Sequence, residues 1–253
     1  MRRPEVTDRQ WAAISSLLSG KATDSGATAK DNRRFFNAVV WIMRTGCPWA
    51  DLPERFGKVD TVRKRFRRLA QQGVWQRLLD ALQAPELEWV MLDSTVVRAH
   101  QHSAGQKNSD PATECLGRSR GGVSTKIHAC VESLGNAVRL IATEGQAGDS
   151  PQALPLLADL APGKVLAETV YDSDATRDYC AERGIEVVIP SHPNHPNRTE
   201  PLPMDEETYR DRNKIERFFG RLKQYRRLGT RYEKTVVSFL AFWHIGAALE
   251  WLR

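Results

Sequence analysis

Four polar residues on one C-terminal helix give the sequence its clearest chemical signal. The segment 206–226 has helical periodicity, and its polar side chains recur at steps of three, four and seven residues. Because these steps return to one side of an α-helix, the side chains share a face. A lone carboxylate among cations suits a metal ligand beside a phosphate, although ion pairs on a solvated helix produce the same pattern. The four residues are Tyr209, Arg212, Glu216 and Lys223.

A second candidate is a basic helix in the N-terminal part of the chain. The spacing predicts a short helix at about 51–56, a turn at Gly57 and a second helix at about 60–72. This is the order of a helix-turn-helix. Its apolar residues would face a core and its basic residues would project outward, as contact with DNA phosphates requires, although a solvated helix in a small bundle has the same pattern. The apolar residues are Val62, Phe66 and Leu69, and the basic ones are Arg63, Lys64, Arg67 and Arg68.

The net charge of +6 is concentrated in two segments. Residues 1–90 hold 16 Lys and Arg against 10 Asp and Glu, and residues 209–234 hold 10 against 3. Either segment alone could be an ordinary solvated surface. The two together favour a polyanion partner such as DNA.

Composition excludes several other classes of protein. Hydrophobic residues make up 41% of the 253, which is enough for a buried core without disulfides. No run of about 18 apolar residues predicts a membrane span, and the start of the chain has no apolar signal-peptide core. The four cysteines show no C-x-x-C spacing, which argues against a zinc knuckle. We therefore expect a soluble cytoplasmic protein with reduced thiols.

The remaining pattern predicts a helical unit followed by an α/β unit. Helical spacing covers 7–18, 33–46 and 74–83, and Pro85 marks a boundary. From residue 87 the order is strand, hairpin, helix, strand, helix, strand and helix. This order favours a mixed sheet with helices on its faces.

Several segments beyond the C-terminal helix share one resemblance. The spacing Tyr-x2-Arg-x3-Glu-x6-Lys resembles the signature of DDE transposases in the insertion sequence four and five families. MLDSTVVRAHQHSAG, LGRSRGGVSTKIHA, GQAGDSPQALPLL, YDSDA and NKIERFFGRLKQYRRLGTRYEKT all resemble the insertion sequence five group. WAAISSLL and TGCPWADLPERFG resemble the helical domain that precedes the catalytic domain there. The likeness spans essentially the whole chain.

The resemblance implies a ribonuclease H-like α/β catalytic domain over 87–253, preceded by a small all-α, helix-turn-helix-like domain over 1–86 that binds DNA ends. It implies cleavage at the inverted-repeat ends of an insertion sequence and strand transfer into target DNA, with two divalent ions, Mg²⁺ or its substitute Mn²⁺. The partner would be double-stranded DNA of the bacterial nucleoid, on which we expect a homodimer because two ends must be joined. The likeness assigns the metal to Asp93, Glu168 and Glu216, and phosphate contacts to Tyr209, Arg212 and Lys223.

The second carboxylate departs from the family pattern. The family has an aspartate four residues before the aspartate of Tyr-Asp-Ser, whereas this chain has Glu168. The longer side chain moves the oxygens by about one bond length, and a misplacement near 1 Å can cost roughly 10²-fold in rate. Asp172 could serve instead or could cap the next helix, and Gly148 stands where the family usually has histidine. The alternatives are a catalytically impaired, transposase-derived DNA-binding protein and a nuclease that cuts without joining.

Overall fold

The chain divides into two compact units. A computed structural model describes residues 5–24, 28–103, 114–119, 121–195 and 200–253. The first unit comprises Met1–Gln83, His100–Lys107 and Leu222–Arg253, and the second comprises Ala84–Ala99 and Asn108–Arg221. The end of the chain is therefore grouped with the N-terminal helices. The division into domains 1–86 and 87–253 stays a prediction.

The helices of the first unit begin where the sequence supplies a cap. α1 (Asp8–Ser15) begins after Thr7, whose hydroxyl accepts a backbone N–H of the first turn in a capping box. α2 (Asn32–Thr45) begins after Asp31 and ends at Gly46, whose φ of 68° is the left-handed conformation that favours glycine. The first two predicted helices are confirmed.

The helix-turn-helix-like segment differs from its prediction in one place. The short helix expected at 51–56 is instead a pair of 3₁₀ turns, Trp49–Asp51 and Glu54–Phe56. Pro53 lies between them and has no N–H to donate, so one continuous helix cannot form. α3 (Val59–Gln71) follows as predicted. Its buried apolar residues include Val62, Phe66 and Leu69.

The core of the first unit lies between α3, α4 (Val74–Leu82) and α10 (Val236–Trp251). α10 is buried along most of its length, and the ring centroids of Phe66 and Phe242 lie 4.4 Å apart across the α3–α10 contact. Although α10 is apolar, no helix among the described residues is long and apolar enough to cross a membrane. The unit also contains α9 (Arg226–Gly229) and the short strand β7 (Thr230–Arg231).

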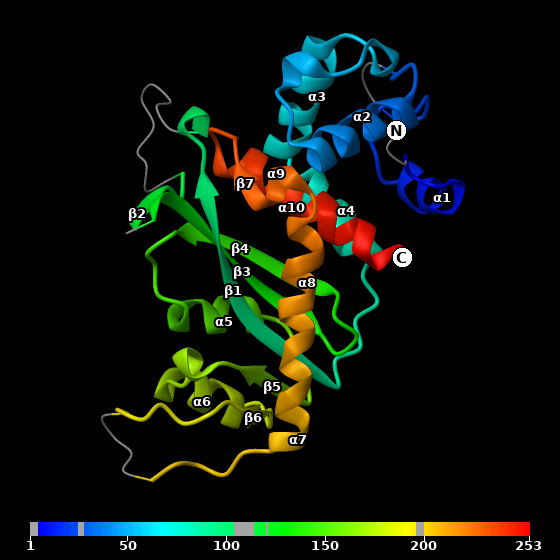
Figure 1. The fold of residues 1–253 in the computed structure, drawn as a ribbon. Coiled ribbons are helices and arrows are strands. Elements are labelled where there is room, and N and C mark those ends of the chain that lie inside the picture. Colours follow the sequence, from blue (N-terminus) through cyan, green and yellow to red (C-terminus); the bar gives the residue numbers. More distant parts are fainter. Residues whose placement is uncertain (1–4, 25–27, 104–113, 120, 196–199) are drawn as a thin grey trace. The chain divides into compact units, whose positions relative to one another are not determined.

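The second unit contains a mixed β-sheet (Figure 1). Its strands are β1 (Trp89–Ala99), β2 (Gly117–Ser119), β3 (Gly122–Glu132), β4 (Ala137–Glu144), β5 (Lys164–Ala167) and β6 (Glu186–Val188). The order is β4–β3–β1–β5–β6, and the short β2 also pairs with β3. β3 is antiparallel to β4 and β1, whereas β1, β5 and β6 are mutually parallel. An antiparallel meander extended by two parallel strands confirms the predicted ribonuclease H-like α/β fold.

Both faces of this sheet are buried. Because side chains alternate along a strand, Leu92 and Met91 point to opposite faces. Leu92 belongs to a core that includes residues of α5 (Ala153–Leu157) and α6 (Asp174–Ala181). Met91 is fully buried on the other face. Figure 1 shows α8 (Asn213–Lys223) running across the strands.

The helix expected at 206–226 is interrupted. It consists of α7 (Glu206–Tyr209), a 3₁₀ turn at Arg210–Arg212, and α8. A 3₁₀ turn is a common junction at helix ends. α8 ends at Lys223, and Tyr225 has extended backbone with φ −74° and ψ 104°, so the prediction of one continuous helix was wrong. The apolar face of α8 is buried through Ile215, Phe218, Phe219 and Leu222.

Candidate active site

Three acidic residues of the second unit come from three elements and meet beside the parallel strands. β1 and β5 pair Leu92 with Ala167. The next residues along the chain are Asp93 and Glu168, so the register of the strands places these two carboxylates side by side. Glu216 comes from the first turn of α8.

The guanidinium of Arg212 is the cation on which these carboxylates converge. Its Nη1 lies 3.0 Å from Glu168 Oε1 and 3.9 Å from Asp93 Oδ2, and its Nη2 donates to Glu216 Oε1 at 2.6 Å. Nη1 is buried and forms no well-aligned hydrogen bond among the described residues, so its contact with Glu168 is mainly electrostatic. With the guanidinium between the acids, no group of three or more His, Cys, Asp or Glu in the described part of the chain is placed to hold a metal ion.

The electrostatics of this cluster follow from burial and from the crowding of acids. Burial raises the pKa of Asp93 to about 6, and the charges of Glu168 and Glu216 add to this, while the Ser94 N–H and Arg212 oppose it. For Arg212, burial disfavours the charged form, but the nearby acidic groups, Glu168 first, outweigh burial and raise the pKa. Three acids around one base leave an excess of negative charge, which attracts further cations.

A second polar network lies beside Asp93 and was not predicted. Asp149 accepts hydrogen bonds from the Ser94 hydroxyl at 2.9 Å and from the Lys126 ammonium at 2.8 Å. The Nδ1 of His128 lies 3.6 Å from the same carboxylate, and burial lowers the pKa of His128 to about 4. The network fixes the residue that follows Asp93. Its members lie up to 55 residues apart, so no local spacing could have revealed it.

Asp172 lies in a different network. Its side chain is fully buried, and it accepts hydrogen bonds from Arg177 Nε and from the His192 backbone N–H, both at 2.6 Å. Ser173, and not Asp172, caps α6. Of the two candidates for the second carboxylate, Glu168 contacts the guanidinium of the cluster, while Asp172 is held by Arg177.

The other polar residues of the C-terminal helical segment fall in different units. The Cζ of Arg212 lies 5.8 Å from the centroid of the Tyr209 ring, within the range of a cation–π contact. Lys223 is the last residue of α8 and belongs to the first unit, where burial lowers its pKa. The second unit thus brings together Tyr209, Arg212 and Glu216.

The basic helix α3 presents its cations outward, as predicted. Lys64, Arg67 and Arg68 are exposed. Arg63 keeps 44% of its side chain accessible and donates to Asp60 Oδ1 at 2.8 Å. Contact of these residues with DNA stays a prediction.

Comparison with known families places the chain in a class. Residues 85–251 match the family model described as "Transposase DDE domain". This match covers more than half of the sequence, so the chain belongs to the DDE-domain transposases, as its motifs predicted. Residues 6–79 match a second model, described as "Putative transposase of IS4/5 family". Within the DDE-domain transposases, this match indicates the insertion sequence four and five families.

Three curated relatives resemble parts of the chain, and one of them is described as a putative transposase. The chain is 39% identical over 132 residues to the "Putative transposase for insertion sequence element IS6501" of Brucella ovis, across 52% of this chain and 100% of that protein. It is 40% identical over 105 residues to the protein y4sN of Sinorhizobium fredii, across 41% of this chain and 84% of that protein. A 16.2 kDa protein of the insertion element IS402 of Burkholderia cepacia is 29% identical over 120 residues, across 42% of this chain and 80% of that protein.

Solved structures give a distant likeness. A pre-cleavage Mos1 transpososome aligns with 81% of this chain and 80% of its own, at 11% identity and a TM-score of 0.27. The Mos1 strand transfer complex aligns with 80% of this chain and 82% of its own, at 13% identity and a TM-score of 0.29. The fold assignment therefore rests on the strand order.

Proposed function

We propose that this transposase cleaves DNA at the ends of an insertion sequence and joins the freed ends to target DNA in a metal-dependent reaction. The observation that carries the proposal is the convergence of Asp93, Glu168 and Glu216 on one cation. Three acids from three separate elements would repel one another without a positive charge between them. Their arrangement is thus suited to bind cations.

The donor set fits hard divalent ions. Mg²⁺ and Mn²⁺ prefer oxygen ligands, and the cluster supplies carboxylates from Asp93, Glu168 and Glu216. Two such ions, when bound, would activate the attacking water or 3′-hydroxyl and stabilise the leaving oxygen. The contacts of the Arg212 guanidinium are an example of a cation accommodated among these side chains.

Arg212 would then have two partners in turn. Arg212 lies 3–4 Å from those acids, and like-charge repulsion would move it away if the carboxylates held divalent ions. The released Arg212 would bind a phosphate of the DNA end, for which its planar fork of donors is suited. Tyr209 lies beside it and would guide the guanidinium between the two positions. Lys223 would hold a phosphate further along the strand.

Glu168 is favoured as the second carboxylate. It reaches Arg212 together with Asp93 and Glu216, whereas Asp172 already has a charged partner in Arg177. Replacing Asp172 would leave the partly buried guanidinium of Arg177 without its counter-ion, at a cost of up to about 3 kcal/mol. Asp172 therefore has a structural role in this proposal.

The outward-facing cations of α3 would bind the backbone of the terminal inverted repeat. They are Arg63, Lys64, Arg67 and Arg68. We infer a homodimer on DNA because two ends must be joined in one product. An alternative function is DNA binding without catalysis, which Glu168 and Gly148 favour because both depart from the family pattern.

Cleavage of DNA carrying the element's own ends tests the proposal. Wild type should nick at the repeat boundary only with Mg²⁺ or Mn²⁺, and Glu216→Ala should lower the rate by at least about 10³-fold because a metal ligand is lost. Glu206→Ala removes an exposed carboxylate from α7 and should leave the rate within about twofold of wild type.

Glu168→Asp separates the alternatives. If wild type is silent and Glu168→Asp cuts, the chain is a catalytically disabled transposase. If both cut and joined strand-transfer product forms, the transposase proposal holds and a nuclease without joining activity is excluded. Cleavage that continues unchanged in Glu216→Ala would contradict the assigned site.

A further inference from the structure

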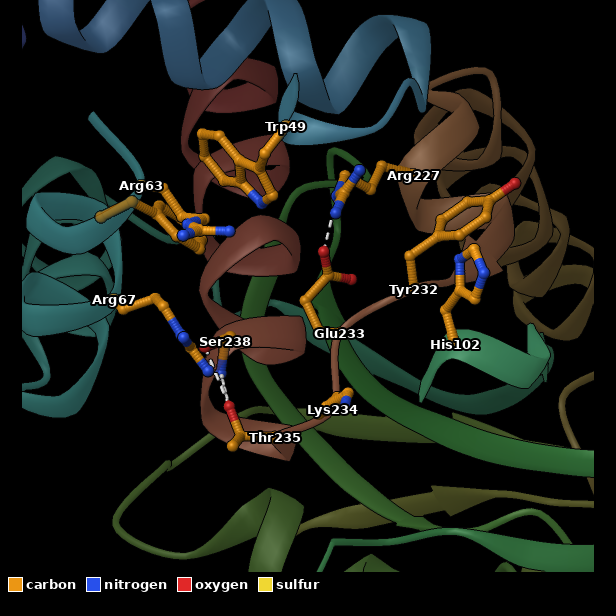
Figure 2. Close-up of a pocket in the computed structure, with 11 residues that line it drawn as sticks. Trp49, Arg63, Arg67, His102, Arg227, Tyr232, Glu233, Lys234, Thr235 and Ser238 are labelled. Carbon is orange, nitrogen blue, oxygen red and sulfur yellow. Dashed lines mark hydrogen bonds and ion pairs between the residues drawn. The ribbon is translucent and has the colours of Figure 1, made fainter. Parts of the chain in front are cut away.

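A cavity in the first unit is lined by cations and aromatic rings, and the proposed catalytic cluster does not use it. Its volume is about 220 Å³ (Figure 2). Small-molecule sites usually occupy about 300–1,000 Å³, so this small cavity would take one nucleotide unit at most. Its lining includes residues of α3, of the 3₁₀ turn Trp49–Asp51, of α9 and of the segment that leads into α10.

One side of the cavity is positively charged. Arg63 and Arg67 of α3 and Lys234, which we call the cationic edge, all line it. Figure 2 shows Arg67 pointing toward the start of α10, where Thr235 caps the helix. The first turn of this 16-residue helix adds a partial positive charge to the same region. An anion such as phosphate is the group that this edge would hold best.

Another part of the lining is aromatic. Trp49 and Tyr232, the aromatic wall, are both half-buried and line the cavity. Trp49 is backed by Phe66, with ring centroids 5.5 Å apart. Trp49 is thus a partly exposed ring held from behind, and such rings are surfaces on which nucleobases stack, at about 1–3 kcal/mol per base.

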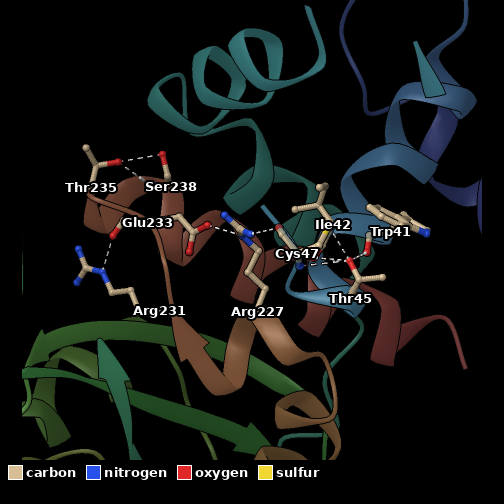
Figure 3. A network of polar contacts seen from close by, with 9 residues as sticks. All are labelled: Trp41, Ile42, Thr45, Cys47, Arg227, Arg231, Glu233, Thr235 and Ser238. Carbon is tan, nitrogen blue, oxygen red and sulfur yellow. Dashed lines mark hydrogen bonds and ion pairs between the residues drawn. The ribbon is translucent and has the colours of Figure 1, made fainter. Parts of the chain in front are cut away.

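The cavity also contains a buried acceptor without a partner. Arg227 Nε donates to Glu233 Oε1 at 2.5 Å, and its Nη1 donates to the Cys47 carbonyl at 2.8 Å (Figure 3). The Glu233 side chain is 5% exposed, and its Oε2 has no hydrogen-bond partner among the described residues. An unpaired buried acceptor is costly, so a ligand that donates an N–H here gains affinity. The amino and imino groups of a nucleobase supply such donors.

We propose that this cavity is a nucleotide-binding site. The cationic edge takes the phosphate, the aromatic wall stacks on the base, and Glu233 Oε2 accepts an N–H from the base edge. Each of the three features is explained by one part of the same ligand. The nucleotide is either an unpaired nucleotide of DNA or a free one, since both present the same groups. Only the DNA source rests on the proposed transposase function.

Binding of mononucleotides to the full chain tests the site. The probes are dAMP, dGMP, dCMP and dTMP, with inorganic phosphate and the matching nucleosides for comparison, measured by saturation-transfer NMR. At least one nucleotide should bind about tenfold more tightly than phosphate or its own nucleoside, because both halves of the site contribute. If phosphate binds as tightly as every nucleotide, the cavity is a simple anion site and the proposal is overturned.

Paired substitutions assign the binding to the cavity. Arg67→Gln with Lys234→Gln removes two exposed charges of the cationic edge and should weaken nucleotide binding about tenfold. Lys64→Gln with Arg68→Gln removes the same charge from exposed positions that do not line the cavity, and should change binding by less than about twofold. Equal losses in the two double variants would show general surface attraction and overturn the site.

Glu233→Gln tests the base contact. It should weaken nucleotide binding while leaving phosphate binding unchanged, because the base loses a charged acceptor. Glu233 also pairs with Arg227, so thermal melting must show that the variant is folded. If Glu233→Gln does not fold, the two double variants still decide the proposal.

Duplex DNA with one 2-aminopurine, either paired or bulged, identifies the source of the nucleotide. Tighter binding of the bulged duplex, with quenching of the probe, assigns the site to an unpaired nucleotide of DNA. Mononucleotide binding without this preference assigns it to free nucleotides, and the absence of both overturns the site. Glu216→Ala should bind nucleotide like wild type, so failure of the catalytic proposal is distinguishable from failure of this one.

Discussion

At the residue scale, the predicted role of Arg212 differs from the contacts that it makes. Its place in the motif predicts a phosphate contact, while its observed contacts are those of a counter-ion for Asp93, Glu168 and Glu216. The two roles are compatible if metal and guanidinium compete for the same carboxylates. Metal binding would then cost the energy of displacing Arg212, and DNA would lower that cost by offering the guanidinium a phosphate. Metal and DNA should therefore bind with positive cooperativity.

Arg212→Gln tests this competition in the absence of DNA. The variant should bind Mn²⁺ about tenfold more tightly than wild type, because no cation must be displaced, and should bind DNA ends more weakly. Titration followed by Mn²⁺ electron paramagnetic resonance measures the first effect. Arg217→Gln is the matched control, since Arg217 is exposed on α8 and donates to Asn213 instead of to the carboxylates. A similar gain in both variants would indicate general charge repulsion, and no gain in either would exclude competition.

At the scale of elements, periodicity predicted most helices and strands, and the strand order followed from the hairpin and β-α pattern. The carboxylates at Asp93, Glu168 and Glu216 were assigned through motif resemblance. Local spacing could not place the Arg212 guanidinium among them, because that depends on side-chain rotamers and on the β1–β5 register. Local spacing also did not predict the Asp149–Lys126 ion pair, because tertiary packing alone brings these two residues together. The grouping of residues 222–253 with the N-terminal helices was not predicted either, because it also depends on tertiary packing.

The end of α2 offers a test of such tertiary constraints. A Cβ at Gly46 would lie 2.9 Å from Arg226 Cβ, and the residue has a φ of +68°. Gly184 has a similar φ of +66° but nothing within 4 Å of its Cβ position. Gly184→Ala should cost about 1 kcal/mol from the backbone alone, and Gly46→Ala about 1–2 kcal/mol more because the chain must shift. Urea unfolding of the two variants checks this, and equal losses would show that α9 yields freely at Arg226.

At the scale of the whole molecule, protonation links stability to pH. Burial lowers the pKa of His244 to about 4 from an ordinary value of 6.5, and the same holds for His128. Between these values the unfolded chain binds protons that the folded chain refuses, so both histidines favour folding above pH 6.5 and lose this contribution as the pH falls toward 4. Asp93 and Glu233 act in the opposite direction, because burial raises their pKa values.

Replacing one histidine isolates its share of this dependence. His244 lies within the apolar α10, and its Nε2 has no hydrogen-bond partner among the described residues, so His244→Leu should be tolerated at pH 7. The unfolding free energy of the variant should fall less steeply than that of wild type between pH 6.5 and 4. The difference corresponds to about one proton, or about 3 kcal/mol over this window. Asp93 and Glu233 are present in both proteins, so their contributions cancel in the comparison.

Denaturant titrations at half-unit pH steps measure how the unfolding free energy of each protein changes with pH. His102→Leu, at an exposed position, is the control. Parallel curves for His244→Leu and wild type would mean that α10 opens enough at low pH to hydrate His244 before the molecule unfolds.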